Sequence, residues 1–216
     1  AEVEGSKDLI SVLWSGADIL RSKMDANEYK DYLLGIVFYK YLSDTFLIKV
    51  YDLIYDEKPK SLKVALDAYK EALEDESAEE LKEQIKSECH YLIEPQLTYT
   101  CFADAARNNA FNRELLQKAF NNIEQSDPLF ADLFTDIDLY SNRLGNGDQK
   151  QSDTISSLVK EIDKADLLNS DAEILGNAYE YLIGQFASET GKKAGEFYTP
   201  QAVSKILTKI AIAGQE

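Results

Sequence analysis

The apolar positions recur at helical spacing along most of the chain. Residues 9–24 carry leucine, valine and isoleucine at intervals of three and four, which indicates an amphipathic helix. Asp25 with Glu28 three residues later has the capping-box pattern, and a long apolar helix is predicted over residues 29–54. Gly35 inside that helix costs about 1 kcal/mol relative to alanine, so we expect another segment to pack closely against it. This helix is the predicted centre of the core.

The helical pattern breaks at the Lys-Pro-Lys sequence of residues 58–60. Two acidic helices are predicted after the break, and Ser77 with Glu80 behind it marks the start of the second. Residues 91–102 form the poorest helix candidate, because Pro95 and the tyrosines and threonines around it favour extended or turn structure.

The next part of the chain alternates between helix and loop. A helix is predicted over residues 112–124, and Asp127-Pro128 begins a short new segment. Residues 141–152 are the clearest loop, and the Gly-x-Gly from Gly145 to Gly147 within them is expected to follow no strand and open no helix. No segment has a clear strand pattern, so the fold class is predicted to be mainly α.

Three local signals organise the last fifty residues. Ser170 with Glu173 is a capping box for another helix. A loop of glycines and lysines follows at residues 191–195. Thr199-Pro200 then supplies a cap and a first-turn proline for the final helix.

Composition and charge exclude several classes of protein. With 44% hydrophobic residues among 216, the chain can bury a core, and no run approaches the roughly 18 apolar residues of a membrane span. Two cysteines make no disulfide framework, and the start lacks signal-peptide order, so we expect a cytoplasmic protein without membrane partners.

The net charge of −16 opposes autonomous DNA binding, because neutralising phosphates requires a basic face. Residues 52–94 hold six basic and thirteen acidic side chains, whereas residues 188–216 hold four basic and three acidic. Any approach to DNA is therefore expected through the C-terminal end or through isolated basic loops.

Other candidate chemistry is weak. Cys89, His90 and Cys101 match no zinc spacing, so no metal site is predicted and packing or surface roles are preferred. A single histidine argues against a Ser-His-Asp or Cys-His hydrolase. The glutamates of residues 79–88 are interpreted as the solvated face of an acidic helix rather than as a carboxylate site.

Three stretches occur in an order typical of one family. The first comprises LWSGADILR, MDANEYK and GIVFYKYLSD, at residues 13–21, 24–30 and 35–44. The second is LGNAYEYLIGQFA at residues 175–187, and the third is GKKAGEFYTP at residues 191–200. Together they resemble the modification subunit of type I restriction-modification systems, a DNA adenine-N6 methyltransferase.

The resemblance implies a helical N-terminal domain that leads into an α/β methyltransferase domain using S-adenosylmethionine. We accordingly divide the chain into a helical domain at residues 1–165 and, at residues 166–216, a connecting helix, a cofactor-site loop and the first helix of a truncated methyltransferase domain. The implied partners are a specificity subunit, a second methyltransferase subunit, the restriction subunit, and double-stranded DNA in the assembled complex.

The third stretch supplies the candidate cofactor site. The segment that lines the family's cofactor pocket corresponds to Glu196, Phe197, Tyr198, Thr199, Pro200 and Gln201. A glycine-bearing loop entering a Thr-capped helix presents free N–H groups to a carboxylate, and the two aromatic rings offer apolar walls. An ordinary capped helix with anchoring aromatics is the alternative. Lys192 and Lys193 are the DNA-contact candidates, with solubilising lysines the alternative.

Two catalytic motifs of such an enzyme are missing from the sequence. It needs a Gly-rich turn after its first strand and an Asn-Pro-Pro-aromatic loop that holds a flipped base. The four prolines, at positions 59, 95, 128 and 200, are never adjacent. No catalytic residue is therefore predicted here, and the chain alone is expected to be inactive. The alternative is a freestanding acidic helical interaction domain. The nucleotide sequence after the codon for Glu216 distinguishes the two: a continuing frame with both motifs supports the methyltransferase, and a stop codon supports the alternative.

Overall fold

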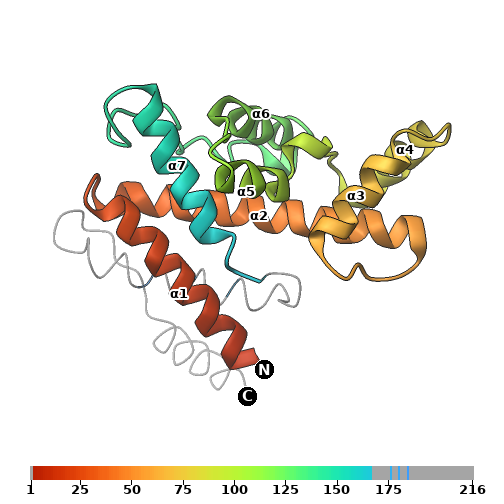
Figure 1. Cartoon of the computed structure of the whole chain (residues 1–216), viewed down its shortest axis with the longest axis horizontal. Helices are drawn as coiled ribbons and strands as arrows, with labels where there is room; N and C mark the ends of the chain where they lie inside the picture. Colours follow the sequence, from red (N-terminus) through yellow and green to blue (C-terminus); the bar gives the residue numbers. More distant parts are fainter. Residues whose placement is uncertain (1, 167–175, 177–179, 181–183, 185–216) are drawn as a thin grey trace, which may run out of the picture.

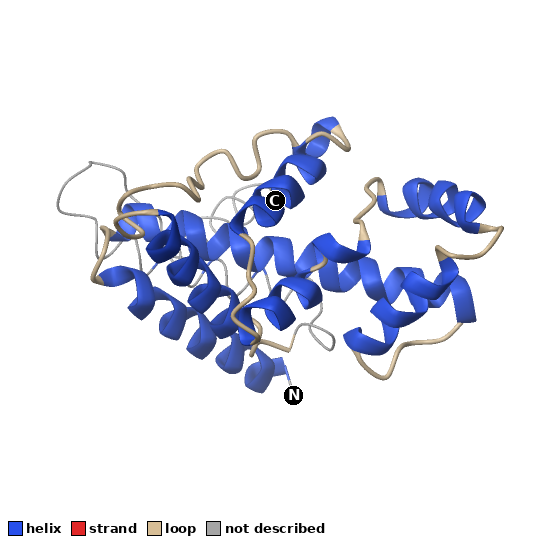
Figure 2. Ribbon diagram, turned by 45° about the horizontal axis from the view of Figure 1, so that its top comes forward, coloured by secondary structure: helices blue, strands red, loops and turns tan. Residues whose placement is uncertain are grey.

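The computed structural model describes residues 2–166 together with residues 176, 180 and 184. All regular elements of this part are helical and it contains no strand, as Figure 2 shows, so the predicted mainly α class is confirmed. No helix among the described residues is long and apolar enough to cross a membrane. The elements are α1 (Glu2–Arg21), α2 (Ala26–Tyr55), α3 (Leu62–Ala72), α4 (Ala78–Cys89), η1 (Pro95–Leu97), α5 (Tyr99–Arg107), α6 (Arg113–Glu124), η2 (Pro128–Phe130) and α7 (Asp148–Ile162).

Helix α2 is the axis of the domain. It spans 30 residues and crosses the molecule in Figure 1, with α1 and α7 near its first half, α5 and α6 over its middle and α3 at its far end. The predicted capping box is present at its start, where the Asp25 N–H donates to Glu28 Oε2 at 3.4 Å. The helix ends at Tyr55 and is capped by Asp56, which adopts a left-handed conformation with φ 54°.

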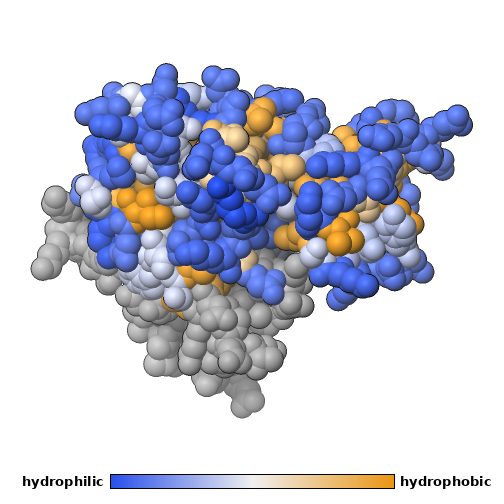
Figure 3. All heavy atoms as spheres, in the orientation of Figure 1, coloured by the Kyte–Doolittle hydropathy of each residue, from blue (hydrophilic) through white to orange (hydrophobic). Residues whose placement is uncertain are grey.

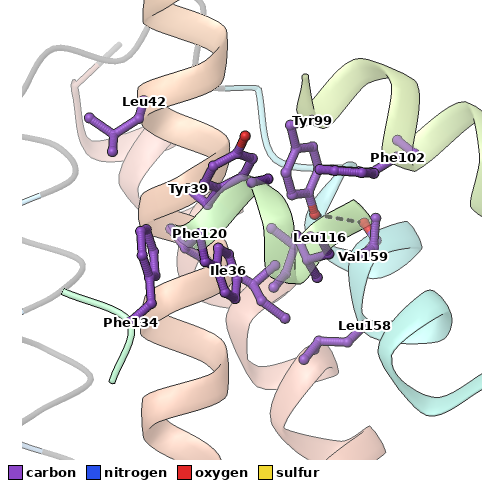
Figure 4. Close-up of a cluster of buried hydrophobic side chains, with 14 of the residues drawn as sticks. Ile36, Tyr39, Leu42, Tyr99, Phe102, Leu116, Phe120, Phe134, Leu158 and Val159 are labelled. Atoms are coloured by element: carbon purple, nitrogen blue, oxygen red, sulfur yellow. Dashed lines mark hydrogen bonds between the residues drawn. The ribbon is translucent and has the colours of Figure 1, made fainter. Parts of the chain in front are cut away.

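An aromatic cluster fills the core beside α2. The rings of Phe120 and Phe134 stack at 4.2 Å between centroids, and Tyr39 meets both edge-on at 5.5 and 6.0 Å. Figure 4 shows these side chains with Ile36 beside α2. Aromatic pairs in this geometry add about 0.5–1.5 kcal/mol each beyond their buried area.

The expected close approach at Gly35 is confirmed. A Cβ atom on Gly35 would lie 2.0 Å from Ile137 Cδ1, so α2 can approach the segment between η2 and α7 only because a side chain is missing there. Gly16 has the same role on α1, where a Cβ would lie 2.8 Å from Leu33 Cδ2 on α2 and 3.1 Å from Leu158 Cδ1 on α7.

Buried tyrosines tie irregular segments to the helices. The hydroxyls of Tyr39 and Tyr69 donate to the carbonyls of Leu97 and Ile93 at 2.7 and 3.1 Å. Tyr91 donates in turn to the carbonyl of Leu42 on α2 at 3.0 Å. Burial raises the pKa of each of these hydroxyls, so they remain neutral donors. Each bond satisfies a carbonyl whose burial without a partner would be costly.

The sequence prediction for residues 91–102 is wrong in its second half. Helix α5 begins at Tyr99, because Thr98 Oγ1 accepts from the Cys101 N–H at 3.4 Å and Ser43 on α2 accepts from the Tyr99 N–H at 2.7 Å. A local cap and a side chain from a distant helix together overcome the weak helix propensity of this stretch. Residues 91–97 are irregular apart from the single turn η1, as expected.

Residues 141–152 were also predicted too broadly as a loop. Helix α7 begins at Asp148 directly after Gly147, whose φ is 88°, so the Gly145–Gly147 motif does open a helix. Ser77 likewise marks the start of α4, where its carbonyl accepts from the Leu81 N–H at 3.0 Å but its side chain does not cap the helix. Its hydroxyl and N–H instead donate to Asp75 Oδ1 at 2.9 and 3.0 Å.

Candidate functional site

The sequence-predicted cofactor and DNA-contact residues fall outside the described residues. These are Lys192, Lys193 and residues 196–201, and their roles stay predictions. The continuously described residues end at Ala165, which is buried, and Asp166. The described residues supply another candidate site, which lies near this end of the chain because its contacts include Asp163.

A buried ion pair lies where α2, α5 and α7 meet. Lys40 Nζ is 2.5 Å from Asp44 Oδ2 one turn along α2, and the two side chains are only 3% and 2% exposed. Lys40 Nζ also lies 5.2 Å from the centre of the Tyr99 ring, on α5. The ammonium group thus gains a carboxylate and an aromatic face in exchange for its water.

Tyr99 connects this pair to α7. Its backbone N–H donates to Ser43 Oγ next to Asp44, and its hydroxyl donates to the Val159 carbonyl at 2.9 Å, the dashed line in Figure 4. Arg107, at the other end of α5, forms ion pairs with Asp104 and with Asp163 just beyond α7. Helix α7 is therefore held at two points by α5.

The electrostatics of Asp44 show that burial dominates. Desolvation raises the pKa of Asp44 from 3.8 to about 6, against the lowering effect of Lys40, and the charges of Asp163 and Asp166 raise it further. Within the described chain, Asp44 Oδ1 has no hydrogen-bond partner. A pair this enclosed cannot meet a substrate, so its role is to position helices rather than to react.

A second polar cluster fastens the loop that precedes α7. The buried Arg113 guanidinium donates to Gln151 Oε1 and, at 3.0 Å, to Asp148 Oδ1, and it lies 4.1 Å from the centre of the Tyr140 ring. Thr154 on α7 donates to the Leu144 carbonyl in the same loop at 2.8 Å. These contacts join α6, the loop and α7 into one unit.

The remaining sequence candidates are dispersed. Cys89 ends α4, His90 caps that helix and lies 3.9 Å from Asp127, and Cys101 lies on α5. Both cysteines are free, and the described residues contain no group of three or more His, Cys, Asp or Glu that could hold a metal. The glutamates at positions 79, 80, 83 and 88 are exposed, and Lys82, Lys86 and Lys49 neutralise three of them.

Sequence reasoning missed the roles of Lys40, Asp44 and Arg113. Lys40 and Asp44 lie inside the most apolar helix at a spacing of four, and this signal could have identified them as a buried pair. Arg113 gave no such signal, because its partners on α7 are 35 and 38 residues away.

The fold and these clusters define a class of protein: an all-helical domain with an aromatic core, whose described part contains no group of side chains that could hold a metal. The chain belongs to the HsdM N-terminal domain family, whose model matches residues 9–162. A second family model, described as N-6 DNA Methylase, matches residues 170–216.

Individual relatives agree with the family. The methylase subunit of the type I restriction enzyme MpnII from Mycoplasma pneumoniae is 29% identical, over 94% of this chain and 39% of its own length. That of MjaVIII from Methanocaldococcus jannaschii is 29% identical, over 95% of this chain and 32% of its own length. The chain thus spans only about two fifths of these relatives or less.

A solved structure shows the same fold. The crystal structure of the type I restriction-modification system methyltransferase subunit from Streptococcus thermophilus has a TM-score of 0.89 and 50% sequence identity. The match covers 97% of this chain and 44% of that chain. The resemblance inferred from the three sequence stretches is confirmed.

Proposed function

We propose that this chain is the N-terminal part of a type I restriction-modification DNA adenine-N6 methyltransferase subunit, in which it contributes subunit assembly and DNA enclosure. The observation that carries the proposal is the order of the two family matches. A helical-domain match over residues 9–162 is followed directly by an N-6 DNA methylase match over residues 170–216.

The character of the helical domain supports an assembly role. Arg107–Asp163 ties α5 to the end of α7 and Arg113–Asp148 joins α6 to α7, and the face shown in Figure 3 is largely hydrophilic with small separate apolar spots. With a net charge of −16, the chain would hold DNA only together with its partners. Those partners are a specificity subunit, a second methyltransferase subunit and the restriction subunit.

We place the cofactor segment at residues 196–201, after a domain boundary near residue 165. The Thr199-Pro200 start of a helix supplies free N–H groups for the carboxylate of S-adenosylmethionine, and Phe197 and Tyr198 supply apolar surface. The bound cofactor provides the methyl group for adenine N6. We also propose that Lys192 and Lys193 contact DNA phosphates, as paired basic residues next to the cofactor segment in the sequence.

The test compares the full-length subunit with a variant lacking residues 2–165. Each protein is combined with the specificity subunit, and transfer of a tritiated methyl group from S-adenosylmethionine to target DNA is measured together with subunit binding. We expect the variant to lose subunit binding and methylation, and the isolated 216-residue chain to be inactive. A deletion variant that assembles and methylates as the full-length subunit does would refute the assembly role.

A further inference from the structure

Two leucines extend into solvent on the loop after α6. Leu129 is 85% exposed and Leu133 is 37% exposed, whereas the phenylalanine that follows each of them turns inward. Phe130 meets the Tyr91 ring edge-on at 5.6 Å, and Phe134 is buried against Phe120. We call residues 127–133 the leucine loop. Both leucines are exposed within one short loop, and clustered exposed apolar residues mark interaction sites more often than scattered single ones do.

The leucine loop is already ordered. Asp127 Oδ1 accepts from the Leu129 N–H at 2.9 Å, and the Asp127 carbonyl accepts from the Phe130 N–H at 2.9 Å. Directly after the loop, Glu124 Oε1 on α6 accepts from the Phe134 N–H at 2.7 Å. A segment fixed in this way loses little conformational entropy when it binds, which favours affinity.

The charges around the leucine loop restrict the kind of partner. Residues 119–142 contain five carboxylates and neither lysine nor arginine. The acidic residues are Glu124, Asp127, Asp132, Asp136 and Asp138. These carboxylates repel nucleic-acid phosphates and anionic lipid headgroups, and they repel a second copy of a chain with a net charge of −16. They are complementary to a protein surface that carries lysine or arginine.

We propose that the leucine loop docks into an apolar pocket with a basic rim on another protein subunit of the assembly. Leu129 and Leu133 enter the pocket, and the surrounding carboxylates face the rim. This inference rests on the proposed function, because that function supplies the subunits with which the chain assembles.

The experiment uses the full-length subunit with Leu129→Ser and Leu133→Ser together. Val64→Ser with Tyr55→Ser is the matched control, since Val64 is 41% and Tyr55 48% exposed on other elements of the domain. The dissociation constant is measured by calorimetry against the purified specificity subunit and, separately, the purified restriction subunit. Circular dichroism melting confirms that each variant is folded.

We expect the leucine variant to bind one of the two subunits roughly 10–100-fold more weakly, the range for loss of one or more buried leucines. The control should bind within about twofold of the native protein. Asp132→Asn, which keeps a residue tolerant of the left-handed conformation at φ 60°, should lower the salt dependence of the same interaction.

The failures of the two proposals are distinguishable. Normal binding of the leucine variant to both subunits, with normal methylation, overturns the docking inference and leaves the proposed function intact. A native subunit that neither assembles nor methylates overturns the proposed function, and the docking inference with it.

Discussion

Gly35→Ala should destabilise the domain even though alanine is the better helix former. The exchange gains about 1 kcal/mol of helix propensity on α2. The new Cβ, however, would lie 2.0 Å from Ile137 Cδ1, 3.2 Å from its Cγ1 and 3.6 Å from Phe134 Cδ1. Ile137 is buried, so its methyl group cannot move into solvent, and overpacking of this kind costs typically about 1–3 kcal/mol. Because the 2.0 Å approach puts the overpacking cost toward the upper end of that range, we expect a net loss of up to about 2 kcal/mol in the free energy of unfolding.

Ile137→Val identifies the contact, because it removes the atom that clashes. Ile137→Val alone should lower the free energy of unfolding by about 0.5–1.5 kcal/mol. In the double variant the clash is gone, so the alanine at position 35 should contribute its favourable helix propensity of about 1 kcal/mol. The two changes should therefore couple by at least about 1 kcal/mol in a cycle measured by urea unfolding and circular dichroism. Gly176→Ala is the control, since that glycine is helical and exposed with no described atom near a new Cβ, and it should not destabilise. Additive losses at positions 35 and 137 would refute the reasoning.

Other expectations follow from the ion pair and the cofactor segment. Asp44→Asn resembles the protonated carboxyl that burial favours, so it should change stability little at pH 4, and Lys40→Met with Asp44→Leu should be neutral or stabilising in thermal melts at pH 7. Because the folded pKa of Asp44, about 6, is raised from 3.8, its contribution to stability is greatest at acidic pH and declines from about pH 4 to pH 6; the double variant should lack this decline in urea titrations. The isolated chain should bind S-adenosylmethionine weakly or not at all and duplex DNA poorly at physiological salt; micromolar affinity in calorimetry, or a tight salt-sensitive gel-shift complex, would contradict this. In the full-length subunit, Phe197→Ala or Pro200→Ala should weaken cofactor binding, for Phe197 by about 1–3 kcal/mol, with little change in melting temperature; early unfolding with normal binding would contradict the assignment.

Signals carried by nearby residues predicted much of the fold. The capping box at Asp25, the apolar run of α2 and the glycine at position 35 each act within a few residues or through a missing side chain, so the sequence alone displays them. The family resemblance was equally local, since three short stretches carried it. The proposed cofactor segment was predicted in the same way and falls outside the described residues.

Features that depend on distant partners could not be predicted in this way. Helix α7 begins with a run of polar residues, which predicts a loop. Gln151 and Thr154 in this run are nevertheless buried, because Arg113 and the Leu144 carbonyl hydrogen-bond to them. Helix α5 similarly needs Ser43, 56 residues earlier, to accept from its first N–H group. Propensity is a weak guide wherever a partner far along the chain satisfies the backbone.

The buried Lys40–Asp44 pair matters more for the orientation of neighbouring helices than for the stability of the domain. Buried ion pairs stabilise little compared with apolar residues of similar volume, so Lys40 and Asp44 are not explained by stability alone. They lie beside Tyr99, whose hydroxyl holds the Val159 carbonyl, while Arg107 holds Asp163 one turn further along the chain. Rotating α7 about its axis would break both contacts, so α5 fixes the orientation of α7. The same contacts fix α7 up to Asp163, close to Asp166, where the continuously described residues end.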